Sequence, residues 1–218
     1  MIARIIDLGS QPYRATLEIQ RELHARVSAG RTPETWIFVE HPPVITLGRN
    51  ARIDNVLLSN ERLAALGIDV VPVERGGDVT YHGPGQLVVY PIRRLERFRE
   101  VVPLVRNLEE AVIRACASFS VRGERWTEHA GVWVGSNQLC AVGLAVKAMT
   151  SLHGIALNVT TDLTYDRAIN PCGLTGYGIT SLERESRSRI QMPDAKEAIR
   201  RAIAQTFHLQ FEELAQAS

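Results

Sequence analysis

Six side chains able to bind a ligand or to react lie within the twelve residues 75–86. They are Arg75, Asp78, Thr80, Tyr81, His82 and Gln86. Five other residues of the stretch are glycine or proline, which predicts a rigid, turn-rich loop rather than the interior of a helix or strand. An ordinary connection seldom combines so many polar groups and glycines. Because apolar runs at 68–73 and 87–92 predict buried strands on either side, we interpret the loop as a binding site.

Cys172 is the second candidate for chemistry. It stands in the sequence Asn170-Pro171-Cys172-Gly173, which predicts a tight turn. Backbone amides that converge at a turn stabilise a thiolate or an oxyanion, so a nucleophilic and a structural role are both open for this thiol. Cys116 falls on a predicted helix and Cys140 inside a predicted strand, where cysteine is usually a small buried hydrophobic residue.

Periodicity predicts the elements that position these residues. Strands are expected over residues 2–8, 36–40, 44–47, 68–73, 87–92, 130–134, 139–146 and 153–159. Helices are expected over residues 12–29, 60–66 with Asn60 as cap, 103–118 and 194–207. The pattern predicts a single α+β domain, residues 1–218, with a central mixed β-sheet flanked by helices. The β-rich carboxy-terminal portion is expected to form a small second sheet.

Composition excludes several classes of protein. The 218 residues are 45% hydrophobic, which supports a real core, and the net charge of +1 argues against a nucleic-acid binder. No run approaches the eighteen apolar residues of a membrane span, and the three cysteines form neither a disulfide framework nor a metal motif. We therefore expect a cytoplasmic protein with no membrane association and no metal. Only Lys147 and Lys196 are lysines, which leaves few for catalysis.

Three motifs in order resemble the signature of a known family. They are Arg75–Gln86 continued by Val88-Val89-Tyr90, then His153–Val159 (His-Gly-Ile-Ala-Leu-Asn-Val), then Asn170-Pro171-Cys172-Gly173. This pattern resembles the lipoyl(octanoyl) transferase family of the lipoate-protein ligase B type, over roughly residues 40 to 182. The resemblance implies the fold of the biotin-ligase and lipoate-ligase catalytic domain.

The resemblance also implies an activity. Members move an octanoyl group from octanoyl-acyl carrier protein to a lysine of a lipoyl domain, through an acyl-thioester on a cysteine that matches Cys172. This is the first step of endogenous lipoate attachment, and the implied acceptors are the lipoyl domains of 2-oxoacid dehydrogenase complexes and the glycine cleavage H protein. Because one thioester is exchanged for another, the transfer needs no ATP, and no cofactor is expected. We expect a monomer.

The substrate-contacting residues implied by the resemblance lie in three short segments. They are Arg75, Gly76, Gly77, Asp78, Val79, Thr80, Tyr81, His82, Ala141, Val142, Gly143, Gly154, Ile155 and Ala156. Glycines in these segments are expected to let an acyl chain or a lysine arm lie against the backbone. Val142, Leu144, Ile155 and Leu157 are expected either to line a hydrocarbon channel or simply to form core.

One position departs from the family. In members of the family, a lysine in a Gly-x-x-Lys-Ile-x-x-x-Gly context lowers the pKa of the cysteine thiol. In this chain the matching segment 135–143 carries Gln138 at the lysine position, and glutamine supplies no positive charge. Three explanations compete. Lys147 reaches the site, or His153 or His82 acts as the assisting base, or the chain is slow or inactive. We rank histidine assistance first, although orienting loops is an equally good role for both histidines.

Two other functions stay open, and so does the role of one basic segment. An ATP-dependent lipoate or biotin ligase shares the fold, and a non-catalytic acyl-binding homologue would explain the loss of the lysine. The arginine-rich segment 93–99 is expected either to steer acidic carrier proteins and lipoyl domains or to be a solvated helix face.

Overall fold

The computed structural model describes residues 2–127, 129–170 and 177–213. Its strands are β1 (Ile2–Ser10), β2 (Thr35–Glu40), β3 (Val44–Leu47), β4 (Asp69–Pro72), β5 (Val79–His82), β6 (Gln86–Ile92), β7 (Glu124–Arg125), β8 (Gly131–Val134), β9 (Asn137–Lys147), β10 (Thr150–Asn158), β11 (Gly178–Ile179) and β12 (Gln210–Glu213). Its α-helices are α1 (Tyr13–Ser28), α2 (Asn60–Ala65), α3 (Val101–Ala117), α4 (Leu182–Ser186) and α5 (Met192–Phe207). Short 3-10 turns are η1 (Ile53–Asn55), η2 (Phe98–Glu100) and η3 (Leu163–Ala168).

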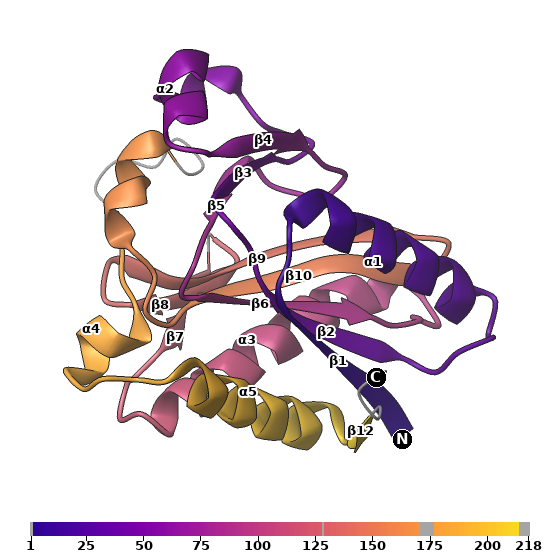
Figure 1. Cartoon of the computed structure of the whole chain (residues 1–218). Coiled ribbons are helices and arrows are strands. Elements are labelled where there is room, and N and C mark those ends of the chain that lie inside the picture. Colours follow the sequence, from indigo (N-terminus) through magenta and orange to yellow (C-terminus); the bar gives the residue numbers. More distant parts are fainter. Residues whose placement is uncertain (1, 128, 171–176, 214–218) are drawn as a thin grey trace.

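A large mixed sheet and a small sheet organise the chain (Figure 1). The large sheet has the order β12-β1-β2-β6-β10-β9-β8-β7, and β11 pairs with β9. Strand β1 runs parallel to β2 and β12, whereas β2, β6, β10, β9 and β8 follow one another antiparallel. The small sheet has the order β4-β3-β5. The predicted fold class, α+β with a central mixed sheet, flanking helices and a small second sheet, is confirmed.

Helices cover both faces of the large sheet (Figure 1). Helix α1 packs on β6 and β10 through a buried stripe that begins with Tyr13, Leu17 and Gln20, spaced one helical turn apart. Helices α3 and α5 pack against each other on the opposite face. None of the described helices is long and apolar enough to cross a membrane.

Sequence patterning placed most elements within three residues of their observed ends, but three expectations were wrong. Residues 79–82 are a strand, β5, because the four glycines and the one proline of the stretch 75–86 fall on either side of this run and leave it free to pair with β3. The small sheet comes from residues 44–82, since the strands β8 to β11 join the large sheet instead. Helix α2 is capped by Ser59, whose hydroxyl accepts the Arg62 N–H at 3.3 Å, rather than by Asn60.

Gly154 is required by the close approach of two central strands. A Cβ at this position would overlap the carbonyl oxygen of Val89 on β6 and would crowd Pro91. We predict that Gly154→Ala lowers the free energy of unfolding by about 1–3 kcal/mol, because the strands must separate to admit the methyl group. Chemical denaturation measures this loss. Gly76→Ala is the control, since its Cβ would meet nothing nearer than the Leu144 carbonyl at 3.6 Å; an equal loss for both variants would contradict the explanation.

Candidate active site

A cavity of about 130 Å³ lies between the segment 75–82 and the α1-facing side of the large sheet. All fourteen predicted substrate-contacting residues line it, together with Gln138 and His153. Strand β6 adds Gln86, Val88 and Tyr90. Three segments that are distant in sequence therefore meet around one space, although their contact with a substrate stays a prediction.

The segment 75–78 is held in place from both sheets. The buried Arg75 guanidinium donates from Nη2 to the carbonyl and hydroxyl oxygens of Thr46 on β3, each at 2.9 Å. The Gly76 N–H donates to the Leu144 carbonyl of β9 at 3.0 Å. A Cβ on Gly48 would overlap the carbonyl oxygen of Gly77, so glycine is required where residues 48–50 run beside this segment.

Two glycines expected to accommodate substrate accommodate protein atoms instead. A Cβ on Gly143 would lie 3.0 Å from Cδ of Arg75, so this glycine makes room for the arginine stem. The space beside Gly154 is filled by Val89 of the neighbouring strand. Their lack of side chains is explained by packing.

A chain of buried polar groups borders the cavity beneath α1. His41 donates from Nδ1 to the Gln11 carbonyl at 2.7 Å, which leaves Nε2 to accept the Tyr90 hydroxyl at 2.8 Å. The Tyr13 hydroxyl lies 3.3 Å from Nδ1 of His153, and the Gln20 side chain accepts the His153 backbone N–H at 2.9 Å. His153 has a φ of 60°, a conformation that non-glycine residues rarely adopt outside constrained sites.

A second hydrogen-bonded chain crosses the cavity wall from β5 to the segment after residue 176. His82 donates from Nδ1 to the Gln86 amide oxygen at 2.7 Å, and the Gln86 amide nitrogen donates to Asn158 at 2.9 Å. Asn158 in turn donates to the Thr180 carbonyl at 3.0 Å. Because each of these side chains forms a hydrogen bond to the next group in the chain, their orientations are fixed.

The three cysteines differ in their surroundings. Cys116 and Cys140 are buried in the core under α3, as expected, and burial raises the pKa of the Cys116 thiol to about 12. Cys172 lies outside the described residues, so its role stays a prediction. The chain on either side of it does reach the cavity, since Ile169 and Ile179 both line it.

Sequence reasoning overestimated the apolar lining and missed several contributors. Val142 and Ile155 line the cavity, but Leu144 and Leu157 pack into the core. The lining residues that lie outside all the predicted substrate-contacting segments and quoted motifs are Tyr13, Ala130, Thr161, Asp162, Ile169 and Ile179, and Val88, Tyr90 and Asn158 lie in the quoted motifs without having been predicted to contact a substrate. Tyr13 lies on the apolar face of α1, which is typical of a helix that packs on a core. The sequence around Tyr13 therefore does not indicate a site.

The arginine-rich segment 93–99 is not the helix face that was one expectation for it. Residues 98–100 form the turn η2, and α3 begins at Val101. Arg93 pairs with Glu34 at 3.5 Å and lies over the ring of Phe207. None of these residues lines the cavity.

Comparison with known proteins decides the family. Residues 12–204 match the lipoyl protein ligase A/B catalytic domain. An octanoyltransferase of Rubrobacter xylanophilus is 47% identical over 179 residues, which cover 81% of this chain and 80% of the relative. An octanoyltransferase of Maridesulfovibrio salexigens is 40% identical over 203 residues, which cover 93% of this chain and 95% of the relative. The chain belongs to the octanoyltransferase family.

Solved structures of ligases share this family's fold. Lipoate-protein ligase A bound with ATP aligns with a TM-score of 0.81 and 14% identity, over 99% of this chain and 90% of the ligase. A biotin protein ligase from Aquifex aeolicus aligns with a TM-score of 0.54 and 11% identity, over 95% of this chain and 70% of the ligase. At these identities the likeness shows the fold alone, and it confirms the predicted resemblance to both ligases.

This octanoyltransferase chain has no lysine at the cavity among the residues that the structure describes. Gln138 lines the cavity at the expected lysine position, and its backbone carbonyl accepts the Thr180 N–H at 2.9 Å. Lys147 is exposed at the far end of β9, about 30 Å along the strand at ~3.3 Å per residue. Lys196 pairs with Asp7 at 2.8 Å. Lys147 does not line the described cavity, which counts against the explanation that it reaches the site.

Burial favours the neutral form of three histidines of this octanoyltransferase, His41, His82 and His153. Desolvation lowers the pKa of His82 to about 3, and it lowers those of His153 and His41 to about 4. For His82 the neighbouring His41 acts in the same direction, whereas for His153 the Glu74 carboxylate opposes it. Histidines with such pKa values accept protons weakly at pH 7, which argues for orientation, but a proton-accepting role for His82 or His153 stays a prediction.

These three histidines predict a loss of stability in mild acid. Each has a folded pKa below the ordinary 6.5, so the unfolded chain binds more protons between about pH 6.5 and pH 4. The contribution of these histidines to the free energy of unfolding is complete above pH 6.5. It decreases as the pH is lowered, by up to about 1.4 kcal/mol per pH unit for each histidine. Urea denaturation from pH 7.5 to 4.5 measures the slope. His82→Gln should reduce it by one proton, and an unchanged slope would contradict the prediction.

Proposed function

We propose that this protein transfers an octanoyl group from octanoyl-acyl carrier protein to a lysine of a lipoyl domain, through a thioester on Cys172. The observation that carries the proposal is the cavity itself. Segments 75–82 and 153–158 form its walls, and Ile169 and Ile179, which flank the Pro-Cys-Gly motif in sequence, complete its lining. The named octanoyltransferases that this chain resembles support the same activity.

The reaction consists of two acyl exchanges. The Cys172 thiolate attacks the carbonyl carbon of the donor thioester, a new C–S bond forms, and the carrier thiolate leaves. The neutral amine of the acceptor lysine then attacks the same carbon, an amide forms, and the Cys172 sulfur is released while solvent takes the amine proton. Because the first step exchanges thioesters of similar energy and the second forms a more stable amide, no nucleotide is consumed.

The acceptors proposed are the lipoyl domains of 2-oxoacid dehydrogenase complexes and the glycine cleavage H protein. We propose that the protein acts as a monomer. A nucleophilic thiol must stay reduced, and the cytoplasm provides such a compartment.

An ATP-dependent ligase is the competing function with the same fold. Identity favours the transferase, since octanoyltransferases match at 40–47% and lipoate protein ligases of known structure at 14–16%. A non-catalytic acyl-binding protein would not have to retain the cysteine motif, which is present at residues 170–173. We therefore favour the transferase.

Substitution of Cys172 tests the thioester. After mixing with octanoyl-acyl carrier protein, the wild type should carry one octanoyl group by intact-protein mass spectrometry, and Cys172→Ser should carry none. Cys116→Ala is the control and should keep the adduct. Full octanoyl transfer by Cys172→Ser would contradict the thioester mechanism. Formation of octanoyl-adenylate from ATP and free octanoate would instead establish that the protein is a ligase.

Substitution of Gln138 tests the missing charge. An ordinary thiol with a pKa of ~8.5 is only a few per cent ionised at pH 7, so a nearby cation should raise the transfer rate by about tenfold. We predict this gain for Gln138→Lys, with the acid limb of the pH–rate profile moved to lower pH. Gln138→Met, which has similar length and no charge, should show neither effect. An unshifted profile in Gln138→Lys would show that position 138 does not control the thiol.

A further inference from the structure

An exposed surface on residues 49–57 lies behind the cavity wall. Ile53 and Leu57 are 69% and 56% exposed, and they are among the few large hydrophobic side chains of the described chain that face solvent to this extent. Arg49 and Arg52 are also exposed. We refer to residues 49–57 as the 49–57 loop; it lies between β3 and α2 (Figure 1).

The first part of the 49–57 loop is bonded to the cavity wall. The Arg49 N–H donates to the Arg75 carbonyl at 3.0 Å, and the Arg52 N–H donates to the Asp78 carboxylate at 3.0 Å. The Asn55 amide donates to the other oxygen of Asp78. The backbone of each arginine is therefore hydrogen-bonded directly to a residue that lines the cavity, Arg75 or Asp78.

The last part of the 49–57 loop is bonded to the chain that leads to the proposed nucleophile. The Leu57 N–H donates to the Ala168 carbonyl at 2.9 Å, and the Asn170 N–H donates to the Asn55 carbonyl at 2.8 Å. Asn170 precedes Cys172 by two residues in the sequence. A protein that contacts the loop is thus held beside both the cavity wall and this segment.

The charges of the loop are available to a partner. Neither Arg49 nor Arg52 forms an ion pair within the part of the chain that the structure describes. The carboxylate of Asp78 is occupied by the loop's own N–H groups, and Asp54 is the one exposed acid of the loop. The loop therefore presents a net positive charge around two apolar side chains.

We propose that the 49–57 loop docks the donor acyl carrier protein, an inference that rests on the proposed function. The donor combines an acidic surface with an acyl arm attached through a phosphodiester, and guanidinium groups bind both carboxylates and phosphates well. Ile53 and Leu57 supply the apolar contact. The acceptor lysine carries no phosphate, which favours the donor as the occupant.

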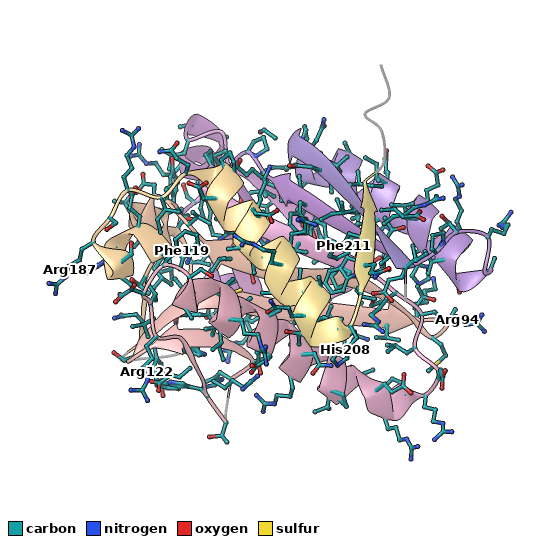
Figure 2. All side chains as sticks on the ribbon, turned by 90° about the horizontal axis from the view of Figure 1, so that it is seen from below. Arg94, Phe119, Arg122, Arg187, His208 and Phe211 are labelled. Atoms are coloured by element: carbon teal, nitrogen blue, oxygen red, sulfur yellow. The ribbon has the colours of Figure 1, made fainter. Side chains whose placement is uncertain are left out.

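The experiment compares two double variants with the same change in charge. Arg49→Glu/Arg52→Glu reverses the charge of the loop, and Arg122→Glu/Arg187→Glu, at two exposed arginines, is the control. Figure 2 views the molecule from the end opposite α2 and shows Arg122 and Arg187 pointing outward there. Steady-state transfer is measured with octanoyl-acyl carrier protein and with octanoyl-N-acetylcysteamine, a small thioester without protein or phosphate, at a saturating concentration of lipoyl domain. KM for the lipoyl domain is measured in a second series, at a saturating concentration of octanoyl-acyl carrier protein.

The loop variant should raise KM for the carrier protein at least tenfold and leave kcat/KM for the small thioester unchanged, since the hydrogen bonds of residues 49 and 52 are made by the backbone. The control should match the wild type. An unchanged carrier KM, an equal rise in the control, or a rise in KM for the lipoyl domain alone would each overturn the proposal. If the wild type transfers from neither donor, the proposed function itself has failed.

Discussion

The cavity depends on hydrogen bonds that join the segment 75–78 to both sheets. A buried guanidinium is costly unless its donors are satisfied, and Arg75 donates to two oxygens of Thr46 and to the Gly76 carbonyl. The next N–H, that of Gly76, bonds to β9 of the large sheet. One short segment therefore fixes the spacing of the two sheets, and with it the shape of the space that they enclose.

The same burial sets the electrostatics of the cavity. Desolvation lowers the pKa values of the histidines, which become neutral, while arginine keeps its charge in a protein interior. The histidine, tyrosine and amide groups bond to one another in two chains, so few of their polar atoms require water. A cavity whose polar side chains bond largely to one another can accept a hydrocarbon at limited cost, although the buried Nε2 of His153 has no hydrogen-bond partner within the described part of the chain.

The motifs predicted which residues line the cavity, because each motif is a short continuous stretch of sequence. The contacts that join one motif to another could not be predicted, because they connect residues far apart in the chain. Tyr13 meets His153 across 140 residues, and no periodicity on α1 reveals that contact. The role of Gly143 could not be predicted either, since this glycine makes room for the aliphatic part of the Arg75 side chain, which comes from a distant segment of the chain. The small sheet was misplaced because strand partners are chosen by topology, which alternation of apolar residues does not encode.

The departure at position 138 leaves the architecture undisturbed, and we expect its effect to be on the chemistry alone. Gln138 contributes to the sheet through its backbone, which pairs with Trp133 and Ile179 and accepts the Thr180 N–H, so any side chain of similar length preserves these bonds. Only the charge of the family's lysine is lost. Both lysines of the chain lie elsewhere, and Arg75 is the cation among the described lining residues. Which group assists ionisation of the proposed Cys172 nucleophile stays a prediction. We expect Gln138 to change the rate at which a thiolate is supplied and to leave the binding cavity intact.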